Sequence, residues 1–371
     1  MKTVAHCITP YLQTAGPWVY EQIIRHVRYR PIVLTQEKTN TEAYPIDPLY
    51  NTEMLSQPQA FLNRLMRKLV GQYLYYAPVL RKEKARLLHA HFGYEGCRVL
   101  WAKRSTGIPL ITSFYGADAT EYSRYPFWLR RYKKLFEEGD LFLAEGSGMA
   151  QRLLDIGCDG NKIKIQRLGV DLERIEYKER NFNGTVRFLI CAGFKEKKGI
   201  NFALEGLARA LSIHPFDYDL TLIGDGVERN KLEERVTSLG LRKYTKFCGM
   251  LPYDQVLGHL QTHDVLLQTS VTAKNGDGEG GAPVILLDAQ AAGMPIVATV
   301  HGDIPEYVVD GKSAFLCQER DIKELSENIV CLIEEQQNWS KMGRIGRKHV
   351  EKHYNSFVQI RDLEALYDTV C

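Results

Sequence analysis

The chain lacks the features that mark several common classes of protein. No apolar run approaches the ~18 residues of a membrane-spanning helix. Its eight cysteines include no C-x-x-C pair, which argues against a zinc site and against a disulfide framework. The N-terminal apolar run is broken by His6 and Pro10, unlike a signal peptide. We therefore expect a cytoplasmic globular protein with reduced thiols.

Length and charge predict two domains with different surroundings. At 371 residues the chain exceeds the roughly 250 to 300 residues at which one core stops growing. The net charge is only +3, but residues 1–175 hold 25 Lys+Arg against 17 Asp+Glu, whereas the remainder holds 23 against 28. The two halves are therefore expected to meet different partners.

Short apolar runs alternate with segments of helical period in both halves, which is typical of parallel α/β sheets. We expect strands at 3–9, 31–35, 108–114 and 141–144, and again at 186–191, 218–223, 246–249 and 265–269. The polar segment 176–184 suits an interdomain linker. The predicted organisation is two Rossmann-like α/β domains, 1–175 and 176–355, with a C-terminal helix in 356–371 that packs back on the first domain.

The segment Glu279–Thr299 (EGGAPVILLDAQAAGMPIVAT) carries the strongest functional signal. Glu279 and Asp288 flank a glycine-rich turn and the start of a helix. Amides at a helix start favour phosphate, and a carboxylate can accept hydrogen bonds from a pair of sugar hydroxyls. Ordinary helix punctuation is the alternative, but Asp288 interrupts an apolar run and needs a partner if it is buried. The pattern therefore favours a nucleotide-sugar ligand.

This segment resembles the acidic motif of retaining GT-B glycosyltransferases of family 4. Further similar segments follow in the family's order: HAHFG (89–93), GVDLER (169–174), LIGDG (222–226), FCGML (247–251) and HGDIPE (301–306). The resemblance implies the GT-B fold, with two Rossmann-like domains facing each other across a cleft. It also implies transfer of a hexose-type sugar from a nucleotide diphosphate donor, with retention of configuration.

The resemblance assigns residues to the donor site. Glu279 would be a catalytic residue that orients the sugar or the pyrophosphate, and Asp288 would hold the ribose hydroxyls. Glu279 stands one residue farther from Asp288 than the family spacing, as if the turn had gained a glycine. The remaining expected donor contacts are Gly16, Lys197, Met250, Gly280, Gly281, Ala282 and Val284.

Lys198 matches the phosphate-binding lysine of the family, and we assign it a catalytic role in neutralising the leaving diphosphate. A solvated lysine turn is the alternative from local sequence alone. The family places an arginine directly after the glycine, where this chain has Phe194. Lys195 or Lys197 is expected to replace that charge; otherwise the enzyme is slow, since one lost donor costs ~10² to 10³ in rate.

In the first domain we assign His91, Tyr115 and Asp118 to acceptor or sugar binding; a purely structural role is the alternative for His91. Many relatives carry histidine where Tyr115 stands. Tyrosine can donate a hydrogen bond but is a poor base near pH 7. The resemblance implies that the phosphate takes the acceptor proton, without a cofactor or a metal ion, although Asp277 and Glu279 superficially resemble a metal-binding pair.

Two basic, aromatic-rich segments, 61–86 and 122–134, can lie on anionic lipid headgroups, and a solvated helix face is the alternative. They favour a glycan or lipid-linked acceptor of cell-surface polysaccharide synthesis, at the inner face of the membrane. A nucleic-acid partner is not expected. Two other functions stay open: a nucleotide-sugar-binding subunit without turnover, and a nucleotide-sugar epimerase on the same fold.

Overall fold

The computed structural model describes residues 1–12 and 17–371, which form two compact units. The first unit comprises Met1–Gly169 and Ser356–Cys371, and the second comprises Val170–Asn355. Each unit is a parallel β-sheet with helices on both faces, so the expected α/β fold class is confirmed.

The start of the second unit differs from the sequence expectation in two ways. The unit begins at Val170 rather than after residue 175, because Ile175 already packs in its core. Residues 176–184, expected to be a linker, lie within this unit. Arg180 is 2% exposed and donates hydrogen bonds to the carbonyls of Leu260 and Ala292, near the ends of two helices. A buried arginine that satisfies helix carbonyls fixes this segment to the second unit.

The first unit contains a seven-stranded sheet of order β3-β2-β1-β4-β5-β6-β7, in which all pairs are parallel. Its strands are β1 (Lys2–Cys7), β2 (Tyr29–Leu34), β3 (Leu49–Tyr50), β4 (Ala85–His91), β5 (Leu110–Ser113), β6 (Leu141–Ala144) and β7 (Ile163–Ile165). Its helices are α1 (Pro17–Ile24), α2 (Gln57–Leu69), α3 (Tyr76–Lys82), α4 (Gly93–Thr106), α5 (Ala117–Thr120), α6 (Pro126–Glu138), α7 (Ser147–Asp155) and α15 (Ser356–Asp368).

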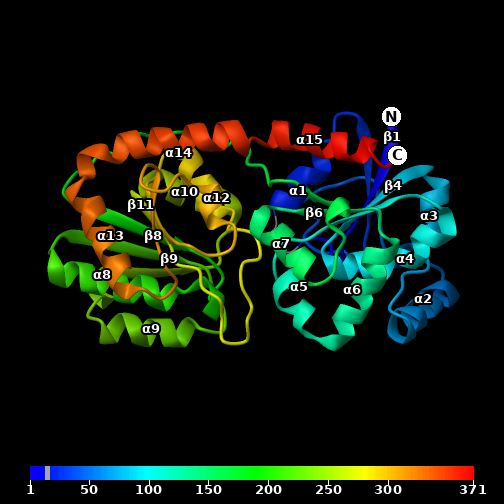
Figure 1. Ribbon diagram of the computed structural model, residues 1–371, viewed down its shortest axis with the longest axis horizontal. Helices are drawn as coiled ribbons and strands as arrows, with labels where there is room; N and C mark the ends of the chain where they lie inside the picture. Colours follow the sequence, from blue (N-terminus) through cyan, green and yellow to red (C-terminus); the bar gives the residue numbers. More distant parts are fainter. Residues whose placement is uncertain (13–16) are drawn as a thin grey trace. The chain divides into compact units, whose positions relative to one another are not determined.

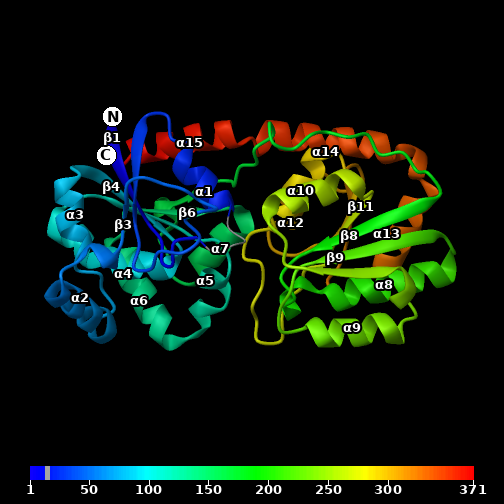
Figure 2. The same ribbon diagram turned by 180° about the vertical axis from the view of Figure 1, so that it is seen from behind.

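The two faces of this sheet bury different sets of side chains, because successive strand residues point to opposite sides. Val4 and Leu87 pack on one face against Leu363 and Tyr367 of α15. Ala5 belongs to the larger core on the other face, which contains α4 and α6. Helices α1 and α15 lie side by side (Figure 1 and Figure 2). The last helix of the chain is thus an integral part of the first unit.

The second unit contains a six-stranded parallel sheet of order β10-β9-β8-β11-β12-β13. Its strands are β8 (Thr185–Cys191), β9 (Asp217–Ile223), β10 (Thr245–Gly249), β11 (Val265–Gln268), β12 (Ile296–Thr299) and β13 (Ala314–Cys317). Its helices are α8 (Ile200–Ile213), α9 (Arg229–Ser238), α10 (Tyr253–Thr262), α11 (Ile285–Ala291), α12 (Ile304–Tyr307), α13 (Ile322–Glu334) and α14 (Trp339–His353). Separate apolar cores cover its two faces.

Both sheets reverse their strand order at one point. In the first unit the chain builds outward from β1 and then returns to place β4 on its other side; in the second, β8 and β11 have the same relation. Ligands of open parallel sheets bind beyond the carboxyl ends of the strands at such a switch point. The loops after β1 and β4, and after β8 and β11, are therefore the places to look for a site.

Candidate functional site

In the second unit, the turn that carries the lysines is held against the end of β11. Gly199 has a φ of 61°, and a Cβ atom there would lie 1.8 Å from the carbonyl oxygen of Thr269. The Thr269 hydroxyl donates to the Gly199 carbonyl at 2.9 Å, and the Val271 amide donates to the Lys197 carbonyl at 2.8 Å. Only glycine permits this close approach, which brings the loop after β8 beside the loop after β11.

Part-buried Lys198 and buried Glu279 form an ion pair at this switch point. Lys198 Nζ lies 2.8 Å from Glu279 Oε2, and the Ser270 hydroxyl donates to Glu279 Oε1 at 2.7 Å. Burial alone would raise the pKa of Glu279, but the charges of Lys198 and Lys197 hold it below its usual value. Glu279 is therefore ionised at neutral pH. Glu279, which stands one residue out of the family spacing, thus directly contacts the lysine that we expect to bind phosphate.

A second lysine and acid lie beside this pair. Lys197 Nζ donates to Asp277 Oδ1 at 3.1 Å and to the Gly278 carbonyl at 3.0 Å. Asp277 and Glu279, the two acids that superficially resemble a metal-binding pair, thus each contact a lysine ammonium. The cluster contains two positive and two negative charges, so an incoming diphosphate could replace the acids as the partner of the lysines.

His301, just after β12, orients the backbone of Glu279. The Glu279 amide donates to His301 Nε2 at 3.0 Å, while His301 Nδ1 lies 2.6 Å from Glu319 Oε1. Because Nε2 accepts a hydrogen, Nδ1 carries the ring hydrogen and donates it to the Glu319 carboxylate. Loops after three neighbouring strands, β8, β11 and β12, therefore converge on Glu279.

Asp288 lies on α11 and is 3% exposed. The Tyr253 hydroxyl donates to its Oδ1 at 3.0 Å, so the buried acid has the partner that the sequence demanded. Burial raises the pKa of Asp288 to about 7, although this hydrogen bond opposes the shift. Asp288 therefore changes charge near neutral pH. Its carboxylate accepts hydrogen bonds more strongly when ionised.

The other expected donor contacts have different surroundings. Gly280 has a φ of 78°, and the Gly281 carbonyl accepts the Asp303 amide at 2.9 Å, which shapes the turn before α11. Ala282 is buried, and Val284 packs against the same core. Met250 is 53% exposed after β10, at the edge of the sheet. Gly16 lies outside the described residues.

Phe194, which stands where the family has an arginine, has a structural role. Its side chain is fully buried, and its ring centroid lies 6.1 Å from that of Phe247. Of the two lysines expected to replace the arginine, Lys195 is exposed and Lys197 is in the cluster with Asp277. The geometry thus favours Lys197 over Lys195.

In the first unit, Asp118 and His91, both expected to bind acceptor or sugar, are buried and have internal partners. The Asp118 carboxylate accepts hydrogen bonds from the amides of Gly93, Gly116 and Tyr115 at 2.8 to 3.2 Å and is 1% exposed. It anchors the turn that carries Tyr115 and has no open oxygen to offer a ligand. His91 is also fully buried, with its Nδ1 atom 2.7 Å from the Tyr115 hydroxyl.

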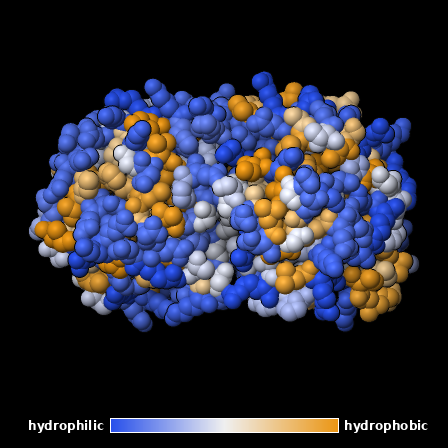
Figure 3. All heavy atoms as spheres, viewed as in Figure 1, coloured by the Kyte–Doolittle hydropathy of each residue, from blue (hydrophilic) through white to orange (hydrophobic). Residues whose placement is uncertain are grey.

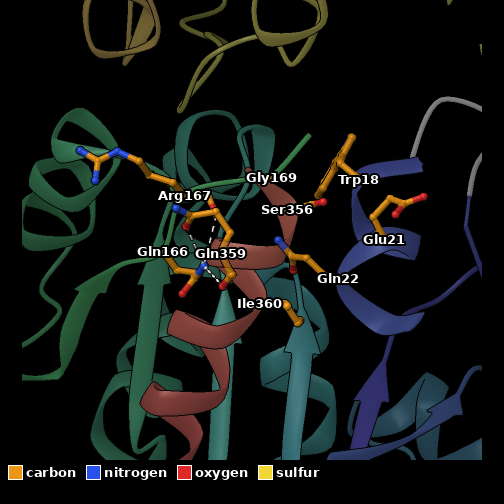
Figure 4. A pocket seen from close by; sticks show the side chains of 9 residues that line it. All are labelled: Trp18, Glu21, Gln22, Gln166, Arg167, Gly169, Ser356, Gln359 and Ile360. Atoms are coloured by element: carbon orange, nitrogen blue, oxygen red, sulfur yellow. Dashed lines mark hydrogen bonds between the residues drawn. The ribbon is translucent and has the colours of Figure 1, made fainter. Parts of the chain in front are cut away.

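Tyr115 is partly buried at the end of β5, beside a polar pocket. Its ring centroid lies 4.6 Å from that of Trp18, and its hydroxyl oxygen lies 3.3 Å from Gln22 Oε1. Gln22 and Trp18 on α1 line this pocket together with Gln359 and Ser356 on α15 (Figure 4). The Ser356 hydroxyl is buried and has no hydrogen-bond partner within the described part of the chain. The pocket itself is small, with a volume of about 10 Å³, which is room for about one water molecule.

Two features of residues 1–12 and 17–371 bear on other functions. His6, His89 and His91 form the one group of three ligand-type side chains close enough to share a metal ion, with ligand atoms within 4.8 Å of one another. Both ring nitrogens of each histidine already contact a hydrogen-bonding partner. No helix in this part of the chain is long and apolar enough to cross a membrane.

The sequence did not indicate several residues around the lysines and acids of the second unit and around Tyr115 in the first unit. Ser270 and Tyr253 contact the two acids, and His301 appeared only as part of a weak motif. The available signal was position, since Ser270 and His301 directly follow β11 and β12. Gln22 and Trp18 carried no such signal because they lie on a helix.

Comparisons with known proteins show the family of this chain. The family described as "Glycosyl transferases group 1" matches residues 173–349, and "Glycosyltransferase Family 4" matches residues 25–174. WcaL of Salmonella typhimurium, named as a colanic acid biosynthesis glycosyltransferase, is 32% identical over 288 residues, which cover 76% of this chain and 70% of that protein. The amylovoran biosynthesis glycosyltransferase AmsK of Erwinia amylovora is 28% identical over 293 residues, with the same coverage.

Solved structures give the same fold. The crystal structure of HepE from Anabaena, in complex with UDP and glucose, matches with a TM-score of 0.80 at 17% sequence identity and covers 100% of both chains. This match shows the fold, and the family models together with the identity to WcaL show the family. The chain belongs to the family 4, or group 1, glycosyltransferases and has their GT-B fold.

Proposed function

We propose that this glycosyltransferase moves a hexose-type sugar from a nucleotide diphosphate donor to a glycan or lipid-linked acceptor in cell-surface polysaccharide synthesis, with retention of configuration. The observation that carries the proposal is the ion pair of Lys198 and buried Glu279 at the switch point of the second sheet. When a donor binds, Lys198 can pair with its phosphate instead of Glu279. Glu279 can then contact the sugar, and this arrangement suits sugar transfer.

The comparisons support the donor and the pathway class. HepE was crystallised with UDP and glucose, which favours a nucleotide diphosphate donor here. WcaL and AmsK are named for the synthesis of colanic acid and of amylovoran, which favours an acceptor in polysaccharide synthesis. Asp288 would accept hydrogen bonds from the ribose, and its neighbour Tyr253 would keep the carboxylate in place.

In the proposed reaction, the bond between the sugar C1 and the β-phosphate oxygen breaks while an acceptor oxygen bonds to C1 on the same face. The acceptor proton passes to the leaving phosphate, so no protein base is required. Lys198 and Lys197 stabilise the negative charge that develops on the diphosphate, and Glu279 orients the sugar. Preorganised charges of this kind are typically the largest contribution to catalysis.

A panel of UDP-, GDP- and ADP-sugars distinguishes this proposal from the two alternatives. Release of the nucleoside diphosphate with one donor, accelerated by an acceptor glycan, is the expected result. Binding without release would identify a subunit that has lost turnover. An isomerised donor would identify an epimerase.

We also propose that the transfer needs no metal ion, because Lys197 and Lys198 already supply positive charge beside the two acids. Turnover should survive EDTA. Complete loss of turnover with EDTA, restored by added Mg²⁺, would contradict this part of the proposal.

Helix α2 supports a lipid-linked acceptor. Phe61 and Leu69 are 67% and 70% exposed, and Asn63 is the one buried residue of this fully described helix. Arg64, Arg67 and Lys68 lie on the same helix and are exposed. Hydrophobic atoms gather over α2 in Figure 3. Helices that expose apolar and basic residues together bind anionic membrane surfaces, where the acyl region takes the apolar side chains and the headgroups pair with the cations.

Co-sedimentation with liposomes tests the membrane contact. The protein should bind vesicles that contain phosphatidylglycerol and should bind phosphatidylcholine vesicles weakly. The double substitution Phe61→Ser and Leu69→Ser should abolish binding, whereas Ile213→Ser, at an exposed apolar residue of α8 in the second unit, should not. Equal binding by all three proteins, or none to anionic vesicles at low salt, would defeat the membrane proposal.

A further inference from the structure

A continuous chain of hydrogen bonds crosses the interior of the first unit. It joins Glu364 on α15, His26, His6 on β1, His91 on β4 and Tyr115 after β5, a set that we call the histidine relay. The successive contacts are 3.3 Å between Glu364 Oε1 and His26 Nδ1, 3.0 Å between His26 Nε2 and His6 Nε2, 2.9 Å between His6 Nδ1 and His91 Nε2, and 2.7 Å between His91 Nδ1 and the Tyr115 hydroxyl.

The relay is shielded from water along its length. The side chains of His26 and Glu364 are 0% and 1% exposed, and His6 and His91 are fully buried. His6 and His91 lie on the two strands that flank the switch point of the first sheet. The relay therefore connects the face covered by α15 with the carboxyl edge of the sheet.

Glu364 sets the direction of the first hydrogen bond. Burial alone would raise the pKa of Glu364, but hydrogen bonds from His26 and from the amides of Arg28 and Val27 lower it to about 2. The ionised carboxylate can only accept hydrogens. His26 must therefore carry its ring hydrogen on Nδ1 and donate it to Glu364.

The remaining directions follow one after another, because a neutral imidazole has one donor and one acceptor nitrogen. Burial, reinforced by the neighbouring histidines, lowers the pKa of His6 well below its usual value and that of His91 to about 3, and burial also lowers the pKa of His26. All three rings are thus neutral near pH 7. His26 Nε2 accepts from His6 Nε2–H, and His6 Nδ1 accepts from His91 Nε2–H. His91 Nδ1 is left without a hydrogen.

We propose that the histidine relay has this single polarity, in which Tyr115 donates its hydroxyl hydrogen inward to His91 and presents its oxygen as an acceptor to a ligand hydroxyl. Gln22 Oε1, 3.3 Å from the Tyr115 oxygen, competes with His91 Nδ1, at 2.7 Å, for the one hydroxyl hydrogen. In the proposed polarity His91 takes that hydrogen, and Gln22 Oε1 is a second acceptor. Two adjacent acceptors select a group that donates, such as a sugar hydroxyl, and of the two residues Gln22 lines the pocket.

The relay thereby makes its buried members positioning residues rather than catalytic residues. The members from Glu364 to His91 act through Tyr115, which alone among them lies beside the pocket. The identification of the hydroxyl as that of a sugar rests on the proposed function; the polarity of the relay does not. His89 lies in the same core but outside the relay, since its nitrogens contact Tyr367 and Ser113.

The ring tautomers of the intact protein test the polarity directly. Two-bond ¹H–¹⁵N correlation spectra of ¹⁵N-histidine-labelled protein at pH 7 distinguish Nδ1–H from Nε2–H. The expected result is Nδ1–H on His26 and Nε2–H on both His6 and His91. Nδ1–H on His6 and His91 would overturn the proposal. So would the loss of these signals on addition of Zn²⁺ alone, which would make the cluster a metal site.

Two substitutions on α15 test the role of Glu364. Glu364→Gln keeps the shape but removes the charge, so His6 and His91 should show mixed tautomers, and KM for UDP-glucose hydrolysis should rise about threefold. Asp368→Asn is the matched control, because Asp368 is on the same helix and also pairs with Arg28; it should change neither. Unchanged tautomers in Glu364→Gln would overturn the proposal. Spectra without any UDP-glucose turnover would instead refute that donor and leave the relay intact.

Discussion

The two units place different chemistry at the same topological position. At the switch point of the second sheet, Lys198 and Glu279 carry opposite charges in direct contact. At the switch point of the first sheet, His6 and His91 are neutral and hydrogen-bonded to each other. In both, a carboxylate fixes the tautomer of a histidine: Glu319 acts on His301, and Glu364 acts on His26.

This difference matches two kinds of ligand group. A part-buried lysine paired with an acid can turn to a phosphate instead, because both partners carry negative charge. A neutral set of oriented donors and acceptors cannot bind an ion well, but it distinguishes hydroxyl groups by direction. We therefore expect the carboxyl edge of the second sheet to bind phosphate and that of the first sheet to bind hydroxyl groups. The following substitutions test this contrast.

The largest effect is expected for Lys198→Ala. Loss of the charge facing the leaving diphosphate should lower kcat by about 10² to 10³ in the donor-panel assay. Lys195→Ala, at an exposed lysine of the same turn, should leave kcat unchanged. Because Lys198→Ala also leaves a buried acid without its lysine, the double variant with Glu279→Gln should restore the melting temperature without restoring turnover, which separates lost chemistry from lost folding. Normal turnover in the double variant would show that transfer does not need these charges. It would contradict the proposed difference between the two sheets.

Glu279→Ala should separate binding from turnover. It frees Lys198 from its acid, so UDP should bind as tightly as to the unchanged protein or more tightly, as measured by calorimetry. Turnover should fall about 10²-fold, since the sugar loses an oriented partner. Weakened UDP binding with normal turnover would contradict this prediction, because Glu279 would then contribute to donor binding and not to turnover.

Asp288 should give the donor site a pH dependence. Its folded-state pKa of about 7 lies above the usual value near 3.9, so its ionised form accumulates as pH rises from 6 to 8. Donor binding should strengthen about tenfold over that range if the carboxylate binds the ribose, and Asp288→Asn should remove this dependence. The folded state binds more protons than the unfolded state between about pH 4 and 7, so stability should fall as pH rises through this window.

A smaller effect is expected at Tyr115, beside the neutral histidines of the first unit. Tyr115→Phe removes one hydroxyl, so KM for the acceptor or sugar should rise about fivefold with little change in kcat. Tyr367→Phe is the control, because its hydroxyl contacts His89 in the same core without belonging to the relay. An effect on kcat as large as that of Lys198→Ala would mean that the first unit also supplies charge stabilisation.

The sequence predicted the sheets and much of the charged site. Strands such as β6 and β11 have continuous apolar runs that can be read directly, and Lys198, Glu279 and Asp288 stand out because charges near buried strands need a reason. The relay could not be predicted in this way. Glu364 and His26 are 338 positions apart, and nothing local to either residue indicates the other.

By itself, the sequence determined that the chain builds two parallel α/β units, because the period of its apolar residues sets the elements and their burial. It also determined the family, because a set of short motifs occurs in one order. Only the tertiary structure decided which groups are in contact. Glu279 pairs with Lys198, and Asp118 accepts hydrogen bonds from backbone amides. Helix α15 contributes a carboxylate to the first unit. Such contacts depend on the register and packing of distant segments, which no local pattern encodes.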